Sequence, residues 1–182
     1  MKISSGLTIA AFFFGLELIS CTTPKTIVMP ETSLTQRTFP SIQVKNLTDE
    51  TKSFPAGFPG ERTLLLIAFE REQQDILDEW VAKLNLRKAG APGWLELPII
   101  DDPGAFMRWF IDNGMKSGIP DQAMRARVFT IYTPRIAFVS HLGLPDARQV
   151  HLAIADRAGH ILHHVSGSWT AAKERSLRAA LR

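Results

Sequence analysis

The sequence predicts an α/β domain in which a central mixed sheet is flanked by helices and closed by a β-hairpin and a C-terminal helix. An apolar run at 63–69 is followed by a helical pattern at 72–86 and a second apolar run at 95–100, the order of a right-handed parallel crossover. Two more apolar runs, at 150–155 and 161–165, flank a turn sequence and predict an antiparallel hairpin. A length of 182 residues fits one such domain with appendages.

The first elements of the domain are short. Residues 42–47 alternate between apolar and polar side chains, which predicts a strand, and residues 48–50 predict a turn. Residues 54–60 contain two prolines and two glycines and predict a loop. The run 63–69 is apolar throughout, so we expect a strand that is buried on both faces.

The segment 72–86 predicts an amphipathic helix, because Ile76, Trp80 and Leu84 recur at helical spacing. Acidic side chains crowd its first turns and basic ones follow its end, which suits the helix dipole. The same spacing places its carboxylates on the solvent face.

The second half of the chain is predicted to alternate between helices and strands. Residues 103–115 predict a helix, and 121–131 a helix or an extended turn. Residues 136–139 are apolar but too few to distinguish helix from strand. Gly159 supplies the left-handed residue of the hairpin turn. The segment 170–181 predicts the last helix, with Thr170 as its N-cap.

The N-terminus has the pattern of a secretory signal. Lys2 precedes a mostly apolar run at 3–16, which is too short for a comfortable transmembrane span. The following Leu18-Ile19-Ser20-Cys21 resembles the bacterial lipobox, whose cysteine is acylated and becomes the new N-terminus. We therefore expect three parts, which are a signal peptide at 1–20, the lipidated Cys21 with a Thr- and Pro-rich tether at 21–40, and the folded domain at 41–182.

Lipid on Cys21 implies a bacterial envelope protein that is held to a membrane and faces the periplasm. Thr22 follows the cysteine instead of the aspartate that resembles an inner-membrane retention signal, which favours the outer membrane. Two other interpretations stay open, an uncleaved N-terminal anchor and an ordinary signal that is cleaved elsewhere.

Three stretches of the domain resemble the thioredoxin fold: 47–55, 60–69 and 150–161, the last followed by Gly167. In secreted proteins of that fold they are the entry hairpin, the central strand and the late hairpin. The chain is most similar to the mitochondrial ATP synthase assembly factor family, whose members also lack the paired cysteines. After Gly159 it departs from these relatives, since it carries two histidines where they favour a basic-aromatic pair.

The resemblance also locates where thiol-disulfide enzymes keep their chemistry. Their CxxC motif follows the central strand and opens a helix, whose N-terminus lowers the thiol pKa. In this chain residues 69–74 stand there and contain no cysteine, and Gln149 rather than a cis-proline precedes Val150. Cys21 is the one cysteine of the sequence, so thiol-disulfide oxidoreductase activity is not expected.

We therefore expect an assembly or accessory factor that binds a protein partner in the envelope, with no cofactor. The expected contact residues surround the place where the fold grips extended peptides: Glu70, Arg71, Glu72, Gln73, Gln149 and Val150.

Two rival functions remain open. A metal carrier or non-thiol enzyme would use Glu70 and Glu72, or His151 and His163, which we expect to face each other across the late hairpin. A structural lipoprotein would have no discrete site.

Other features favour no particular chemistry. A net charge of +3 is too small to indicate nucleic-acid binding. A basic stretch could bind an acidic partner or lipid head groups, or be a mixed amphipathic segment; it contains Arg125, Arg127, Tyr132 and Arg135. We expect Trp94, Trp109 and Trp169 to be core or interface residues.

Overall fold

The computed structural model of the chain describes residues 37–182. Cys21, the predicted signal peptide and most of the predicted tether lie outside the described residues. In the part that is described, no helix is both long and apolar enough to cross a membrane.

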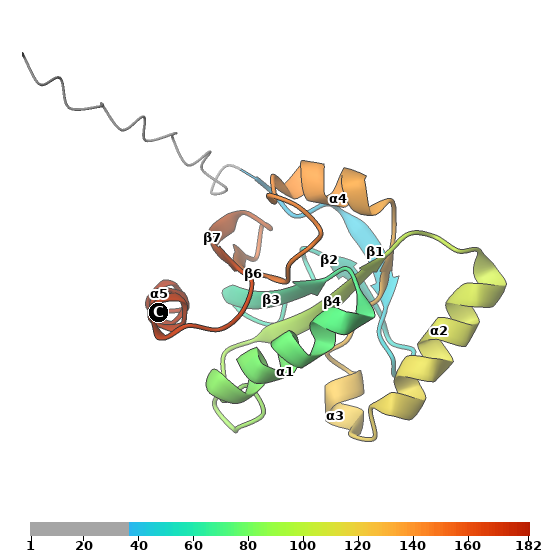
Figure 1. The fold of residues 1–182 in the computed structure, drawn as a ribbon, viewed down its shortest axis with the longest axis horizontal. Coiled ribbons are helices and arrows are strands. Elements are labelled where there is room, and N and C mark those ends of the chain that lie inside the picture. Colours follow the sequence, from blue (N-terminus) through green and yellow to red (C-terminus); the bar gives the residue numbers. More distant parts are fainter. Residues whose placement is uncertain (1–36) are drawn as a thin grey trace, which may run out of the picture. The chain divides into compact units, whose positions relative to one another are not determined.

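A five-stranded mixed sheet runs through the domain in the order β5-β4-β3-β6-β7 (Figure 1). Its strands are β3 (Arg62–Ala68), β4 (Trp94–Ile100), β5 (Ile131–Tyr132), β6 (His151–Asp156) and β7 (Ile161–Ser166). The first three are parallel to one another, whereas β6 and β7 run antiparallel to their neighbours. The predicted crossover and the predicted closing hairpin are both confirmed.

A separate two-stranded hairpin precedes the sheet and is formed by β1 (Ile42–Lys45) and β2 (Thr51–Phe54). The helical segments are η2, a 3-10 turn (Arg71–Gln73), α1 (Gln74–Lys83), α2 (Ala105–Gly118), α3 (Gln122–Arg125), α4 (Arg135–Leu142) and α5 (Ala171–Ala180). The short apolar run at 136–139 is thus part of a helix.

Each face of the sheet has its own apolar core. On one face, side chains of α1, α3 and α5 pack against β3 and β6; they include Leu77, Trp80, Met124 and Leu177. On the other face the β1–β2 hairpin and α4 cover the sheet, with a cluster of phenylalanines around Phe39, Phe54 and Phe138. The prediction of a sheet flanked by helices is therefore confirmed.

The glycine predicted for the β6–β7 turn and the N-cap predicted for α5 are both confirmed. Gly159 has a φ of 89°, and a Cβ there would lie 2.9 Å from Pro55. Both the backbone conformation and the lack of space for a side chain therefore require glycine in this turn. The Thr170 hydroxyl accepts a hydrogen bond from the Lys173 amide and caps α5.

Residues just before the predicted boundary at 41 also pack against the domain. Thr38 pairs with His160, which precedes β7, and Phe39 is only 2% exposed.

α2 differs from the other long helices, because none of its 14 residues is buried. It lies beyond the β5 edge of the sheet, at the right of Figure 1.

Candidate functional site

The turn at the end of the central strand β3 is held by a buried amide side chain. Gln73, 6% exposed, accepts a hydrogen bond from the Phe69 amide at 2.8 Å through Oε1. Its Nε2 donates to the Ala147 carbonyl at 3.1 Å. Gln73 therefore links the start of α1 to the loop before β6.

An arginine joins the ends of two parallel strands at the same edge of the sheet. Arg135, the first residue of α4, pairs with the Glu70 carboxylate and donates to the Phe69 carbonyl at 3.0 Å. It also pairs with Asp101, just after β4, at 2.8 Å. The arginine lowers the pKa of Asp101 through hydrogen bonds from its backbone amide and side chain. The charges of Glu70 and Arg135, which are 65 residues apart in the chain, thus neutralise each other.

The predicted contact residues fall into two groups. Glu70, Arg71, Glu72 and Gln149 are exposed, although Glu70 is engaged by Arg135. Gln73 and Val150 are buried, so their side chains are not available to a partner. Of the six predicted contact residues, the four exposed ones remain candidates. Which of these contact a partner stays a prediction.

The histidine pairing expected across the late hairpin is wrong. His163 lies opposite Ile154 in the register and contacts the Ser176 hydroxyl of α5 at 3.0 Å. The partner of His151 is His164, with 2.9 Å between Nδ1 of His151 and Nε2 of His164. A register shift between Ile154 and Ala155 contributes to the difference, since a bulge moves the side chains that follow it.

The His151–His164 pair is held in the neutral form. His151 is fully buried and its Nε2 lies 2.7 Å from the Asp146 carbonyl, which only accepts; Nε2 therefore carries the proton and Nδ1 accepts from His164. Burial lowers the pKa of His151. Burial, with smaller contributions from the charges of His151 and His163, lowers the pKa of His164 to about 4.

These contacts do not make a metal centre. Within residues 37–182, no three His, Cys, Asp or Glu side chains come together in a group that could hold a metal ion. His151 has both ring nitrogens engaged, by Asp146 and His164.

A buried carboxylate in the second parallel strand was missed from the sequence. Glu96 of β4 is 4% exposed and accepts from Gln74 Nε2 at 3.2 Å. Burial raises the pKa of Glu96 above that of an ordinary glutamate. A charged residue within the otherwise apolar run 94–100 was the signal available.

The predicted basic stretch is dispersed by the fold. Arg127 lies over the Trp94 ring, 5.1 Å from its centroid, and Arg125 donates to the Ile119 carbonyl at 2.6 Å. Arg135 belongs to the network at the end of β3. These arginines therefore serve internal contacts rather than a continuous basic surface.

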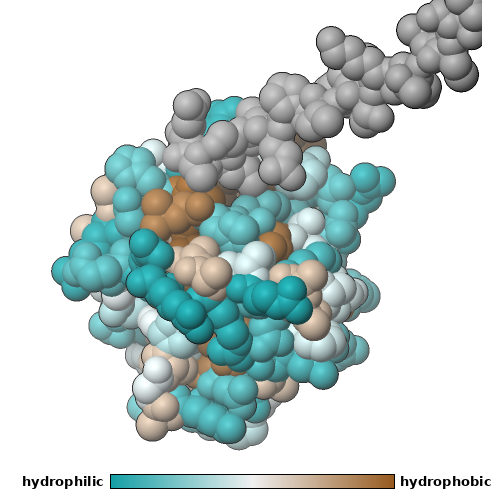
Figure 2. Space-filling model, turned by 90° about the vertical axis from the view of Figure 1, so that its left-hand side faces the viewer, coloured by the Kyte–Doolittle hydropathy of each residue, from teal (hydrophilic) through white to brown (hydrophobic). Residues whose placement is uncertain are grey.

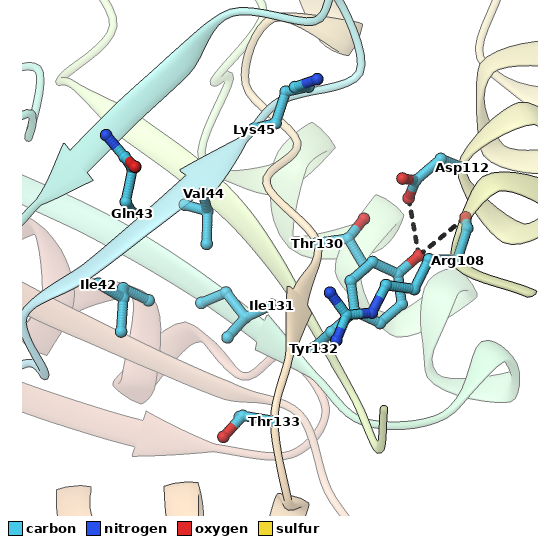
Figure 3. Close-up of a pocket in the computed structure, with 10 residues that line it drawn as sticks. All are labelled: Ile42, Gln43, Val44, Lys45, Arg108, Asp112, Thr130, Ile131, Tyr132 and Thr133. Carbon is cyan, nitrogen blue, oxygen red and sulfur yellow. Dashed lines mark hydrogen bonds between the residues drawn. The ribbon is translucent and has the colours of Figure 1, made fainter. Parts of the chain in front are cut away.

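A cavity of about 390 Å³ lies between β1, β5 and the inner side of α2 (Figure 3). The Tyr132 hydroxyl donates to the Asp112 carboxylate at 2.8 Å, and the Arg108 guanidinium lies over the Tyr132 ring. Burial, followed by the bond to Asp112, raises the pKa of Tyr132. These polar contacts attach α2 to the edge of the sheet.

Comparison with known proteins identifies the architecture. No family model and no curated protein matches the chain. Among solved structures, the exposed lipoprotein thioredoxin of Streptococcus pneumoniae superposes with a TM-score of 0.50 at 12% identity, over 78% of this chain and 98% of that one. The chain has a thioredoxin-like fold. The thioredoxin domain of a thiol-disulfide oxidoreductase from Bacteroides vulgatus (TM-score 0.52, 11% identity, 80% and 96% covered) agrees.

A third neighbour, also thioredoxin-like, is BsSco, a member of the Sco family of cytochrome c oxidase assembly proteins (TM-score 0.54, 11% identity, 80% and 94% covered). At these identities the neighbours show the fold alone. They do not show the predicted similarity to the ATP synthase assembly factor family. In this thioredoxin-like chain Glu70 and Gln73, three residues apart, occupy the turn between central strand and helix.

Proposed function

We propose that the chain is a lipid-anchored envelope protein whose thioredoxin-like domain acts by binding a protein partner, as an assembly or accessory factor, and not by thiol exchange. The observation that carries this proposal is the turn Glu70–Gln73. The position of the fold's thiol chemistry holds a glutamate paired with Arg135 and a buried glutamine with both ends of its amide bonded. These groups stabilise the turn, whereas exchange chemistry needs an accessible thiolate.

The exposed side chains around that turn support a binding role. Arg71, Glu72 and Gln149 are exposed, and the Gln73–Ala147 hydrogen bond ties the turn that carries the first two to the loop that precedes Gln149. A site built on fixed elements loses little entropy when a partner binds. The predicted resemblance of the sequence to the ATP synthase assembly factor family would favour assembly of a membrane complex as the form of this function.

The anchor is tested by the intact mass of the protein extracted from bacterial membranes. We expect a chain that begins at Cys21 and carries a diacylglyceryl group, and we expect Cys21→Ser to lose the lipid and the membrane association. A mature chain that begins elsewhere with a free thiol contradicts the anchor.

The binding role is tested by crosslinking in intact envelopes followed by affinity purification of the full-length protein. We expect a discrete crosslinked protein that is lost in the double variant Arg71→Glu/Glu72→Lys. Arg157→Glu is the matched control, because Arg157 is also an exposed arginine but lies in the β6–β7 turn, where it pairs with Glu61. Recovery of no specific partner contradicts binding and favours a structural lipoprotein. Equal loss in the control contradicts the assigned surface.

A further inference from the structure

Helix α2 presents its most apolar side chains to solvent. Phe106, Trp109 and Phe110 are 75%, 63% and 60% exposed, and Met107 is 42% exposed. At 100° per residue these four positions share one face of the helix. We call them the aromatic face. Phe106 and Trp109 stack on each other across one turn, with ring centroids 6.5 Å apart.

The opposite side of α2 contacts the domain through mainly polar groups. Arg108 and Asp112 surround Tyr132 (Figure 3). The Met115 sulfur lies 3.6 Å from the Thr130 hydroxyl. A surface helix of a globular domain normally buries its apolar stripe and exposes its polar one. In α2 this arrangement is reversed, which indicates that the aromatic face has a partner outside the described domain.

The two cations of α2 are paired within the domain. Arg108 forms an ion pair with Asp102, and Lys116 lies 2.8 Å from Asp49. The one acidic residue of α2, Asp112, is hydrogen-bonded to Tyr132 on the side away from the aromatic face. The aromatic face itself therefore carries no charged side chain that would oppose its entry into a lipid head-group region. The side of the domain that carries α5 is mostly hydrophilic, with scattered hydrophobic areas (Figure 2).

The length of chain outside the described domain limits where a membrane can lie. Fifteen residues, 22–36, separate Cys21 from Arg37, the first described residue. Fully extended they span at most about 50 Å, and a flexible chain of this length averages about 20 Å. If Cys21 carries lipid, every face of the domain can reach the bilayer surface.

We propose that the aromatic face of α2 inserts into the head-group region of the membrane and gives the anchored domain a second lipid contact with a fixed orientation. The proposal rests on the proposed lipid anchor. Phe and Trp side chains favour the membrane interface, and a helix that lies in that region buries its apolar face by about 5–10 Å.

Trp109 reports directly on this contact. Of the four tryptophans, Trp80 and Trp94 are buried and Trp169 is partly buried, so Trp109 is the exposed one. The full-length lipidated protein is reconstituted into phosphatidylcholine vesicles with or without brominated acyl chains, and vesicle flotation is measured alongside fluorescence. Trp109→Phe identifies the Trp109 share of the emission.

We expect brominated lipid to remove about half or more of the Trp109 emission, because bromine quenches only at short range and a face buried by about 5–10 Å brings the ring close to the acyl chains. The double variant Phe106→Gln/Phe110→Gln is expected to float unchanged but to lose the quenching. Ile136→Gln, which removes an 86% exposed side chain from α4, serves as the matched control and should keep it. Because the nearby charges are paired, high salt should leave the quenching unchanged.

Each other result overturns the proposal in a recognisable way. A protein that floats without quenching of Trp109 keeps its anchor but has no lipid contact at α2. A protein that does not float contradicts both the anchor and the lipid contact. Quenching that survives the Phe106→Gln/Phe110→Gln change, or Trp109 shielded only when a purified protein partner is added, contradicts the assignment of this face to lipid.

Discussion

The end of the central strand and the outer side of α2 use their side chains in opposite ways. At the end of β3, polar groups such as Gln73 and Arg135 are engaged by other parts of the domain. On α2, large apolar side chains such as Phe106 and Trp109 have solvent instead of a core. At the turn after the central strand, polar side chains are thus bonded to the backbone and to one another, whereas on α2 apolar side chains remain exposed.

The largest expected effect tests the structural role of the β3 end. Gln73→Ala leaves the buried Phe69 amide and the Ala147 carbonyl without their partner, so we expect a loss of about 2–4 kcal/mol in the free energy of unfolding. Urea denaturation measures it. Glu72→Ala, one residue away but exposed, is expected to change stability by less than about 0.5 kcal/mol. Equal losses of stability in the two variants would contradict a structural role for the buried Gln73 amide.

Acid should destabilise the domain through the neutral histidine pair. The pKa of His164 falls from 6.5 to about 4 on folding, so the unfolded chain binds the proton first and stability falls as pH drops from about 6.5 to about 4. The loss is at most about 3 kcal/mol and is reduced by water contact. His164→Gln should reduce the dependence of stability on pH, which thermal melts at a series of pH values between about 4 and 6.5 measure. An unchanged slope shows that other groups cause it.

Glu96→Gln should stabilise the domain at neutral pH. Burial raises the pKa of Glu96 above 4.5 in the folded state. The folded wild-type protein therefore has its full stability below that pH and loses stability as the buried carboxyl ionises at higher pH. The neutral amide avoids this cost and keeps an acceptor for Gln74, so we expect a gain of about 1–2 kcal/mol at pH 7. The gain should vanish below about pH 4.5. A stability difference between the variant and the wild type that is the same at all pH values contradicts the raised pKa of Glu96.

The smallest effect on folding is expected at the aromatic face. Phe106→Gln/Phe110→Gln should change the free energy of unfolding by less than about 0.5 kcal/mol, because neither ring is buried in the domain. A thermal melt of the detergent-solubilised protein measures it. Destabilisation by several kcal/mol means that the rings serve the fold, and the contrast with Gln73 is then lost.

Periodicity was enough to predict β3, β4, β6 and β7 and most of the helices, because buried runs and amphipathic stripes are local properties of the sequence, whereas the two-residue edge strand β5 was not predicted. The link from Arg135 to Glu70 and Asp101 was not predictable, since it joins segments that only the sheet brings together. The histidine register depended on a bulge, and a bulge has no clear local signature. For α2 the sequence predicted a helix at 103–115 but not which of its sides faces the domain.

Photo-crosslinking from two positions in native membranes tests the account most directly. A photoreactive residue is placed at 106 on the aromatic face in one full-length protein and at 72 beside the β3 turn in another. We predict lipid adducts from position 106 and a discrete protein adduct from position 72. A protein adduct from position 106 together with none from position 72 would contradict the account.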